Sequence, residues 1–276
     1  MGTEKRERQK AGTHARRSER EAQQRRSQRR RSTLTFVGIA AAVVVVALVI
    51  SLVGGGDDDT AAPDLPSATG EPDAGDETTE PAAPLPCPPV DGVDEPVLSF
   101  PAPPPDCLTP GATYTAVFDT TAGEIVVDLD TERTPGTVNN FVYLARYGYY
   151  DGSEMFRTDP SIDIIQGGAP STNSASDPGP GYQIPDEGQP FSYSPGDLVM
   201  ARSAAPDSAG AQFFFSAGPD TVLLNDQGTY VTFGRTSTGL DVLEEILASH
   251  VDQPDNPLGG APDPAVTVRS VTIVES

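Results

Sequence analysis

Residues 149–168 read YYDGSEMFRTDPSIDIIQGG, a turn-rich half followed by an apolar run that ends in two glycines. The stretch contains a single arginine, Arg157, and Gln166 follows nine residues later. An Asp-Pro pair interrupts the chain between them, and the isoleucine-rich run after it predicts a short strand over residues 162–166. We therefore expect this stretch to place a cation and an amide on either side of a turn, beside an apolar strand.

The segments around this stretch predict a mainly β domain. Alternating apolar and polar residues indicate strands, which are expected at Tyr114–Thr120, Glu124–Leu129, Ile162–Gln166, Asp197–Ala201, Gln212–Ala217, Val231–Arg235 and Ala265–Val274. Helical periodicity predicts one helix from Thr134-Pro135 to Gly148 and a second from about Leu240 to Ser249. Because strands and helices do not alternate, the pattern favours a closed or nearly closed antiparallel barrel whose ends the helices cover.

Several classes of catalytic site are excluded by the residue types available. The two histidines, His14 and His250, lie in the basic head and at a predicted helix end, so neither stands beside a nucleophile. No phosphate-binding or dinucleotide-binding glycine pattern occurs in its required context, and two cysteines without a nearby histidine fall short of a zinc ligand set. We expect no metal and no cofactor. Arg157 is the only basic residue between Arg146 and Arg202, which suits a reaction that needs hydrogen-bond donation without proton transfer.

Four motifs, in a fixed order, resemble those of cyclophilin-type peptidyl-prolyl cis-trans isomerases. They are TPGTVNNFVYLARYGYYDG at residues 134–152, FR and IIQGG within 156–168, LVMARSAAPDSAGAQFFF at 198–215, and TYVTFGR at 229–235. The resemblance covers about residues 112–275. It implies a closed eight-stranded antiparallel barrel capped by two α-helices, and an enzyme without a cofactor that acts on proline-containing polypeptides.

The resemblance also implies roles for single residues. Arg157 would donate a hydrogen bond to the prolyl nitrogen of the twisted amide, and Gln166 would hold the substrate backbone. We expect the proline pocket to be formed by Ile164, Met200, Gln212, Phe214 and Leu224, with Ala201 and Tyr230 at its border. Rotation about an X-Pro bond crosses a barrier of about 18–20 kcal/mol because resonance stiffens the C–N bond. A donor that binds the twisted amide better than either planar form lowers this barrier without a covalent step.

Some positions depart from the pattern of the family. Phe156 stands where a histidine usually precedes the arginine, and the arginine and glutamine are nine rather than eight residues apart. If the extra residue causes no shift, Asp163 falls where an aromatic residue often floors the pocket; if the insertion is absorbed later, Ile162 takes that place. Tyr230 matches a pocket histidine. These departures leave two alternatives open: a module that binds proline-containing segments with weak or no isomerase activity, and an anchored spacer domain that uses its acidic surface.

The N-terminal part of the chain predicts a membrane anchor. Leu34–Val53 is 20 residues long and contains neither a charge nor a proline, which at about 1.5 Å per residue spans the hydrocarbon core of a bilayer. Residues 1–33 hold 12 basic and 4 acidic residues, whereas the remainder carries a net charge of −30. The basic flank predicts a cytoplasmic N-terminus and an outer C-terminus. No small-x-small cleavage site closes the apolar run, which favours an uncleaved anchor over a signal peptide.

Residues 54–111 are expected to form an acidic, proline-rich linker that precedes an isomerase domain over residues 112–276. The linker contains both cysteines, Cys87 and Cys107, and an outer location favours a disulfide between them.

No aromatic residue lies among the arginines of the basic head, residues 1–33, to stack on bases, so we expect the head to contact anionic lipid rather than nucleic acid. The arrangement resembles membrane-anchored cyclophilins of Gram-positive bacteria, and we expect a monomer in the cell membrane.

Overall fold

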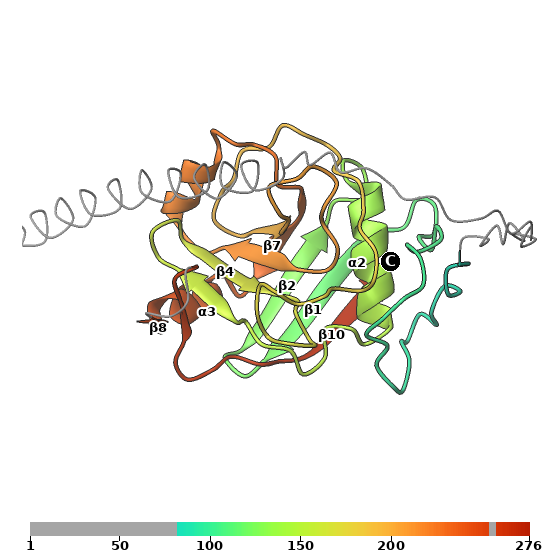
Figure 1. Cartoon of the computed structure of the whole chain (residues 1–276), viewed down its shortest axis with the longest axis horizontal. Coiled ribbons are helices and arrows are strands. Elements are labelled where there is room, and N and C mark those ends of the chain that lie inside the picture. Colours follow the sequence, from blue (N-terminus) through green and yellow to red (C-terminus); the bar gives the residue numbers. More distant parts are fainter. Residues whose placement is uncertain (1–81, 254–257) are drawn as a thin grey trace, which may run out of the picture. The chain divides into compact units, whose positions relative to one another are not determined.

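Ten strands form a single antiparallel sheet in the computed structural model, which describes residues 82–253 and 258–276 (Figure 1). The strands lie in the order β10-β1-β2-β7-β5-β6-β4-β3-β9-β8. Their bounds are β1 Tyr114–Thr120, β2 Glu124–Leu129, β3 Arg157–Asp159, β4 Ile164–Gly167, β5 Asp197–Met200, β6 Phe213–Ser216, β7 Thr232–Thr238, β8 His250–Asp252, β9 Gly260–Pro262 and β10 Val268–Glu275.

The sheet differs from the predicted closed barrel of eight strands. It has ten strands, and β10 and β8 stand at its two ends without pairing with each other. Near the start of β10, one isolated bridge joins Glu154 to Thr267, and the amide of Gly152 donates to the carbonyl oxygen of Val268 at 2.8 Å. The chain just before Glu154 is a turn, so these contacts do not extend into a strand pair.

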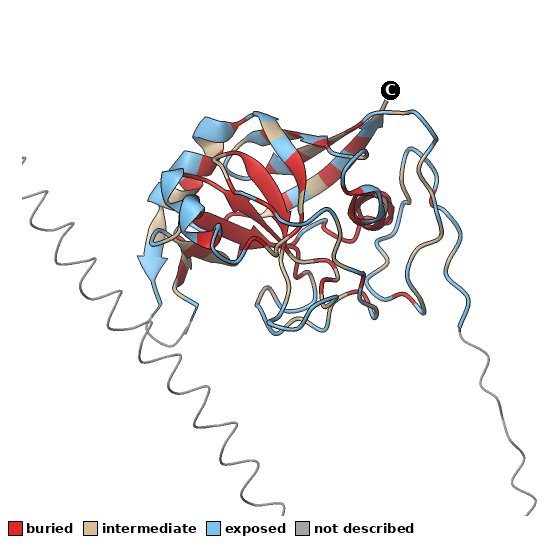
Figure 2. Ribbon diagram, turned by 90° about the horizontal axis from the view of Figure 1, so that it is seen from above, coloured by how far each residue is buried: buried red, intermediate tan, exposed pale blue. Residues whose placement is uncertain are grey.

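Two α-helices and one 3-10 helix accompany the sheet within the described residues. α2 (Pro135–Arg146) begins with the proline that the sequence places at the first helical position, and it packs against β10. α3 (Leu240–Ala248) lies against β2, β4 and β9. The 3-10 helix η1 (Pro219–Leu224) follows β6 and was not predicted. Figure 2 shows buried residues concentrated on the strands and on the helix beside the C-terminus.

The core between the sheet and α2 is largely aromatic. The ring of Phe118 lies 5.6 Å from Phe213 and 5.3 Å from Phe215, both in edge-on contact. On the helix side, Phe141 stacks on Tyr150 at 5.0 Å. Each such pair adds about 0.5–1.5 kcal/mol beyond the burial of its area. These contacts hold Phe213 and Phe215 of β6 in the core. Phe214, between them in the strand, points to the opposite face of the sheet.

Residues 82–111, which we call the strap, pack on the folded domain. The amide of Val97 donates to the carbonyl oxygen of Tyr147 at 3.0 Å. Phe100 is 3% exposed, and its ring contacts four tyrosines, Tyr143, Tyr147, Tyr149 and Tyr182. The predicted disulfide between Cys87 and Cys107 is present and closes the strap on itself. The described part of the predicted linker therefore belongs to the folded unit, and packing on the domain starts before residue 112.

The predicted membrane span, Leu34–Val53, lies outside the described residues, as do the basic head and the first part of the predicted linker. Within residues 82–253 and 258–276, none of the helices has the length and apolar character that a membrane crossing requires.

Candidate active site

β3 and β4 form a short hairpin that brings Arg157 and Gln166 opposite each other. The register pairs Arg157 with Gln166 and Asp159 with Ile164. Residues directly opposite in an antiparallel pair point to the same face of the sheet, so all four side chains share one face. The loop between the strands, residues 160–163, takes up the nine-residue spacing without disturbing this pairing. The spacing that departs from the family pattern thus leaves the arginine beside the glutamine.

The guanidinium of Arg157 is held at all three of its nitrogens. Nη1 donates to Oε1 of Gln166 at 3.0 Å, Nη2 donates to Oδ2 of Asp159 at 3.0 Å, and Nε donates to the carbonyl oxygen of Leu258 at 2.6 Å. The Arg157 side chain is 15% exposed. A guanidinium carries five N–H groups. Among the described residues, three of them have partners, which leaves one N–H on each terminal nitrogen for a ligand.

Gln166 and Gln212 extend this arrangement into a chain of amides. Because arginine has no acceptor atom, Gln166 must turn its oxygen toward Arg157 and its NH₂ group away. That NH₂ group donates to Oε1 of Gln212 at 2.9 Å, and Nε2 of Gln212 donates to the carbonyl oxygen of Ala175 at 3.4 Å. Gln166 is 7% exposed. These contacts therefore fix the orientation of both side-chain amides: the oxygen of Gln166 points to Arg157, and the oxygen of Gln212 points to Gln166.

Strand pairing gathers several of the predicted pocket residues on the same face. Phe214 of β6 lies opposite Gln166, and Ile164 precedes Gln166 by two residues. Both apolar side chains are buried. Tyr230 stands at their edge, with its ring 5.7 Å from the ring of Phe214 and nearly perpendicular to it. An apolar patch thus lies on the same face of the sheet as Arg157.

Met200 does not share this face. The register pairs Met200 with Phe213 and Val199 with Phe214. Met200, which is 1% exposed, therefore belongs with the core side of the sheet, and Val199 points to the face of Phe214. A shift of one residue along a strand reverses the direction of its side chains. The prediction of Met200 as a pocket residue fails for this reason.

Two other predicted residues are placed by loops and η1. The amide of Ala201 donates to the carbonyl oxygen of Gln212 at 2.8 Å, which attaches the residue after β5 to the backbone of Gln212. Leu224 is the last residue of η1 and is buried. The hydroxyl of Tyr193 donates to the carbonyl oxygen of Tyr230 at 3.1 Å and accepts from its amide at 2.9 Å. This double contact fixes the backbone at the border of the pocket.

Asp163 anchors η1 instead of flooring the pocket. Its Oδ2 accepts from the amide of Asp220 at 2.7 Å, and its carbonyl oxygen accepts from the amide of Ala217 at 2.8 Å. Its φ angle is +51°, in a left-handed region that aspartate tolerates better than most residues. Burial raises the pKa of the Asp163 carboxyl above its ordinary value, and the nearby Asp220 and Asp159 add to this effect. The loop after β3 is thereby joined to the segment that ends at Leu224.

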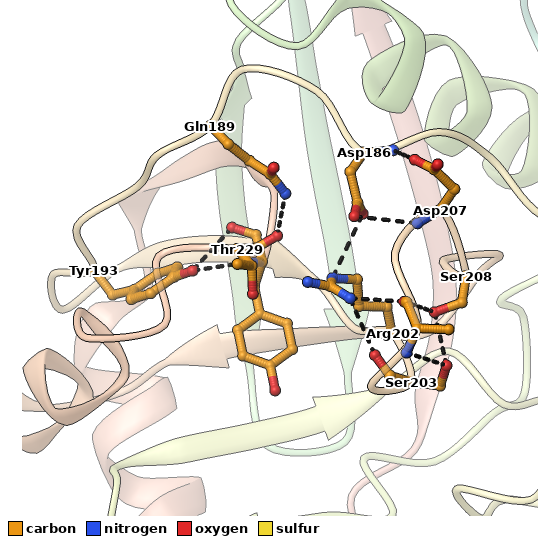
Figure 3. Close-up of polar contacts among 10 residues, drawn as sticks. Asp186, Gln189, Tyr193, Arg202, Ser203, Asp207, Ser208 and Thr229 are labelled. Carbon is orange, nitrogen blue, oxygen red and sulfur yellow. Dashed lines mark hydrogen bonds and ion pairs between the residues drawn. The ribbon is translucent and has the colours of Figure 1, made fainter.

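Arg202, which the site prediction did not include, is a second cation beside the pocket border. Its Cζ lies 5.7 Å from the centroid of the Tyr230 ring. Figure 3 shows Arg202 between Asp186 and Ser203; Nε is 3.5 Å from Oδ1 of Asp186, and Nη1 donates to the carbonyl oxygens of Ser203 and Ala205. Its position directly after Ala201 was the available sequence signal. These contacts hold Arg202 beside Tyr230 at the border of the pocket.

The described residues, 82–253 and 258–276, contain no group of three or more His, Cys, Asp and Glu side chains that could hold a metal ion. The site described above instead offers hydrogen-bond donors, amides and an apolar face. This set can bind a planar or twisted amide and an apolar ring next to it, because the donors and the apolar patch adjoin each other.

Comparison with known proteins agrees with this geometry. Residues 115–273 match the model of the family described as cyclophilin type peptidyl-prolyl cis-trans isomerase/CLD. Peptidyl-prolyl cis-trans isomerase B of Bacillus subtilis is 36% identical over 118 residues, which is 43% of this chain and 79% of that protein. Human peptidyl-prolyl cis-trans isomerase-like 1 is 31% identical over 157 residues, covering 56% and 90% of the two chains.

A solved structure of similar fold is that of a cyclophilin type peptidyl-prolyl cis-trans isomerase from Cryptosporidium parvum. It has a TM-score of 0.51 and 25% identity, and the match covers 59% of this chain and 99% of the other. A second crystal structure of that protein, in the presence of the dipeptide Ala-Pro, has a TM-score of 0.50 and 26% identity. Since the family model matches more than half of the sequence and the fold agrees, the chain belongs to the cyclophilin-type peptidyl-prolyl cis-trans isomerases.

Proposed function

We propose that the protein isomerises X-Pro bonds in exported or cell-envelope polypeptides, and that Arg157 supplies the catalytic hydrogen bond. The observation that supports this role is the three-point contact of its guanidinium, which leaves two N–H groups beside the patch of Ile164 and Phe214. The presence of the dipeptide Ala-Pro in a crystal structure of the related protein supports a proline-containing substrate.

The mechanism follows from how the amide changes during rotation. A planar X-Pro amide delocalises the lone pair of its nitrogen, and the twisted amide does not. A remaining N–H of Arg157 therefore hydrogen-bonds to the prolyl nitrogen only when the amide is twisted. Gln166 keeps one N–H beyond the bond to Gln212, and this N–H holds the substrate carbonyl. Catalysis is then differential binding of the twisted state, with no covalent intermediate and no proton transfer.

The isomerase reaction is tested with a proline-peptide assay on three proteins. Arg157→Ala should lower kcat/KM by roughly 10²-fold, the usual effect of removing one preorganised donor. The matched control is Arg269→Ala, which removes an exposed arginine that pairs with Asp119 at 2.7 Å. Its activity should equal that of the wild type. An inactive wild type would contradict the reaction, and an unchanged Arg157→Ala would contradict the role of that residue.

We also propose that the domain works outside the cell membrane as a membrane-anchored cyclophilin of a Gram-positive bacterium. The uncharged run Leu34–Val53 and the basic residues before it support this topology. The disulfide between Cys87 and Cys107 supports an oxidising location. Protease added to intact protoplasts should digest the domain and spare the N-terminal head. Protection of the domain until the cells are lysed would contradict an outer location.

A further inference from the structure

Asp159 is the one acidic side chain in contact with the guanidinium of Arg157 among the described residues. It lies two residues after Arg157 in β3, so both side chains point to the same face of the sheet. Oδ2 of Asp159 is 3.0 Å from Nη2 of Arg157. The two side chains are 15% and 20% exposed, in that order, so the ion pair is largely withdrawn from water.

The carboxylate of Asp159 is itself held in place. Its other oxygen, Oδ1, accepts from the amide of Ser161 at 3.0 Å and from the hydroxyl of Ser161 at 2.6 Å. An aspartate that accepts hydrogen bonds from a residue two positions later forms a tight local turn. The orientation of the carboxylate is therefore set by the loop and does not depend on Arg157. This distinguishes it from an exposed ion pair, where two mobile side chains gain little by meeting.

The three contacts of the guanidinium have different geometric effects. Leu258 and Gln166 hold Nε and Nη1, and these two points still allow the planar group to tilt about the line between them. The contact of Nη2 with Asp159 is the third point, and it fixes the plane. A fixed plane determines where the remaining N–H groups point. Misplacement of a catalytic group by about 1 Å can cost 10²-fold in rate.

We propose that Asp159 is a positioning residue for isomerisation, which aims the free N–H groups of Arg157 at the prolyl nitrogen. The proposal rests on the proposed function of Arg157 but assigns a separate role to a separate residue. Asp159 acts through Arg157 and does not contact the substrate. Its effect on catalysis therefore requires the arginine.

The test is a double-mutant cycle in the full-length chain, read out as kcat and KM for a proline peptide. Asp159→Ala should lower kcat/KM about 10-fold, mainly through kcat, because positioning acts on the twisted state. Asp159→Asn keeps an acceptor oxygen and should lose less. In the Arg157→Ala background, Asp159→Ala should cause no further loss. Asp119→Ala, which breaks the exposed pair with Arg269, is the control and should leave kcat/KM unchanged.

Two kinetic outcomes would overturn the proposal. One is unchanged kcat/KM in both Asp159 variants, and the other is an equal loss with and without Arg157. If Asp159→Ala does not fold, as judged by its thermal transition, Asp159→Asn is compared in the two backgrounds and decides in the same way. Loss in Arg157→Ala together with full activity of the Asp159 variants would refute this proposal and leave the proposed function standing.

A spectroscopic measurement tests whether Asp159 orients the guanidinium of Arg157, and it does not depend on the peptide assay. NMR of the Arg157 side chain in the wild type should show restricted rotation about its Cζ–Nη bonds, because Nη1 and Nη2 each have a partner. Asp159→Ala should release Nη2 and average these signals. Signals that are equally restricted in both proteins would contradict a positioning role for Asp159.

Discussion

The position of Asp163 in the loop between β3 and β4 disfavours the ionised form of its carboxyl. Burial raises the pKa of its carboxyl above 3.8, and the nearby Asp220 and Asp159 act in the same direction. A raised pKa in the folded state means that folding favours the neutral acid. The stabilisation that this acid provides is complete below the ordinary pKa and is lost as pH rises through the raised pKa.

Asp163→Asn should therefore stabilise the protein at neutral pH. Asparagine keeps an oxygen that can accept from the amide of Asp220, and it tolerates the positive φ angle of this position. The gain in free energy of unfolding should be small at about pH 4 and larger at about pH 7, as urea unfolding at the two values would measure. A gain that does not depend on pH would contradict the electrostatic explanation.

Single residues of the site were predictable to different degrees. Arg157 and Gln166 were predicted together because both lie in one short stretch of sequence, and the pairing of β3 with β4 places them opposite each other. Met200 was misassigned because the face of a strand residue depends on the register with its neighbour, which a sequence does not contain. Asp159 was not recognised as a partner of Arg157, because their contact depends on a turn that orients the carboxylate.

The strap is an element without regular secondary structure that is held by one buried ring. Phe100 contacts four tyrosines from α2 and the loops near it, and its amide donates to the carbonyl oxygen of Pro180 at 2.8 Å. The loop after Gly168 also supplies the carbonyl of Ala175 to Gln212. The strap thus packs against a loop that reaches the amide chain of the site.

Phe100→Ala should lower the free energy of unfolding by about 3 kcal/mol, the lower end for removing a buried aromatic side chain. Val90→Ala is the matched control in the same segment, since Val90 is 58% exposed, and it should change stability by less than about 0.5 kcal/mol. Chemical unfolding of the two variants gives both numbers. Equal stability of the two variants would show that the strap does not depend on Phe100.

The longer elements were easier to predict than the short ones. β1, β2, α2 and α3 have enough residues for a period of two or of 3.6 to be visible. β3, β8 and β9 were missed because a strand of three residues shows barely one alternation. η1 was missed because a 3-10 helix follows neither the period of two nor that of 3.6. The strap was predicted as a linker because its proline content masked the apolar residues Val93, Val97 and Phe100, which the structure packs on α2 and its neighbours.

At the scale of the whole molecule, the strap determines where the folded unit begins. The disulfide between Cys87 and Cys107 closes a loop within it, and Nδ2 of Asn139 on α2 donates to the carbonyl oxygen of Pro105 at 2.9 Å. The composition of residues 54–111 predicted a spacer, because few of them are large and apolar. Packing of the strap depends on tyrosines that lie far along the sequence, which local composition cannot reveal.

A fragment of residues 82–276 should be more stable than a fragment of residues 112–276. The shorter fragment loses both the Phe100 contacts and the disulfide, so its free energy of unfolding should fall by more than the about 3 kcal/mol expected for Phe100→Ala. Thermal and urea unfolding of the two fragments measure this difference. Equal stability would mean that the strap contributes nothing to the folded unit.

The central claim is that Arg157 turns a proline-binding face into an isomerase. NMR exchange spectroscopy on a proline-containing peptide tests it directly, because uncatalysed isomerisation takes tens of seconds and gives no exchange peaks on its own. With a small amount of the wild type, we predict exchange peaks between the cis and trans forms. With Arg157→Ala, we predict peptide binding, seen as shifts, without exchange peaks. Binding by the wild type without exchange, or equal exchange in both proteins, would contradict the account.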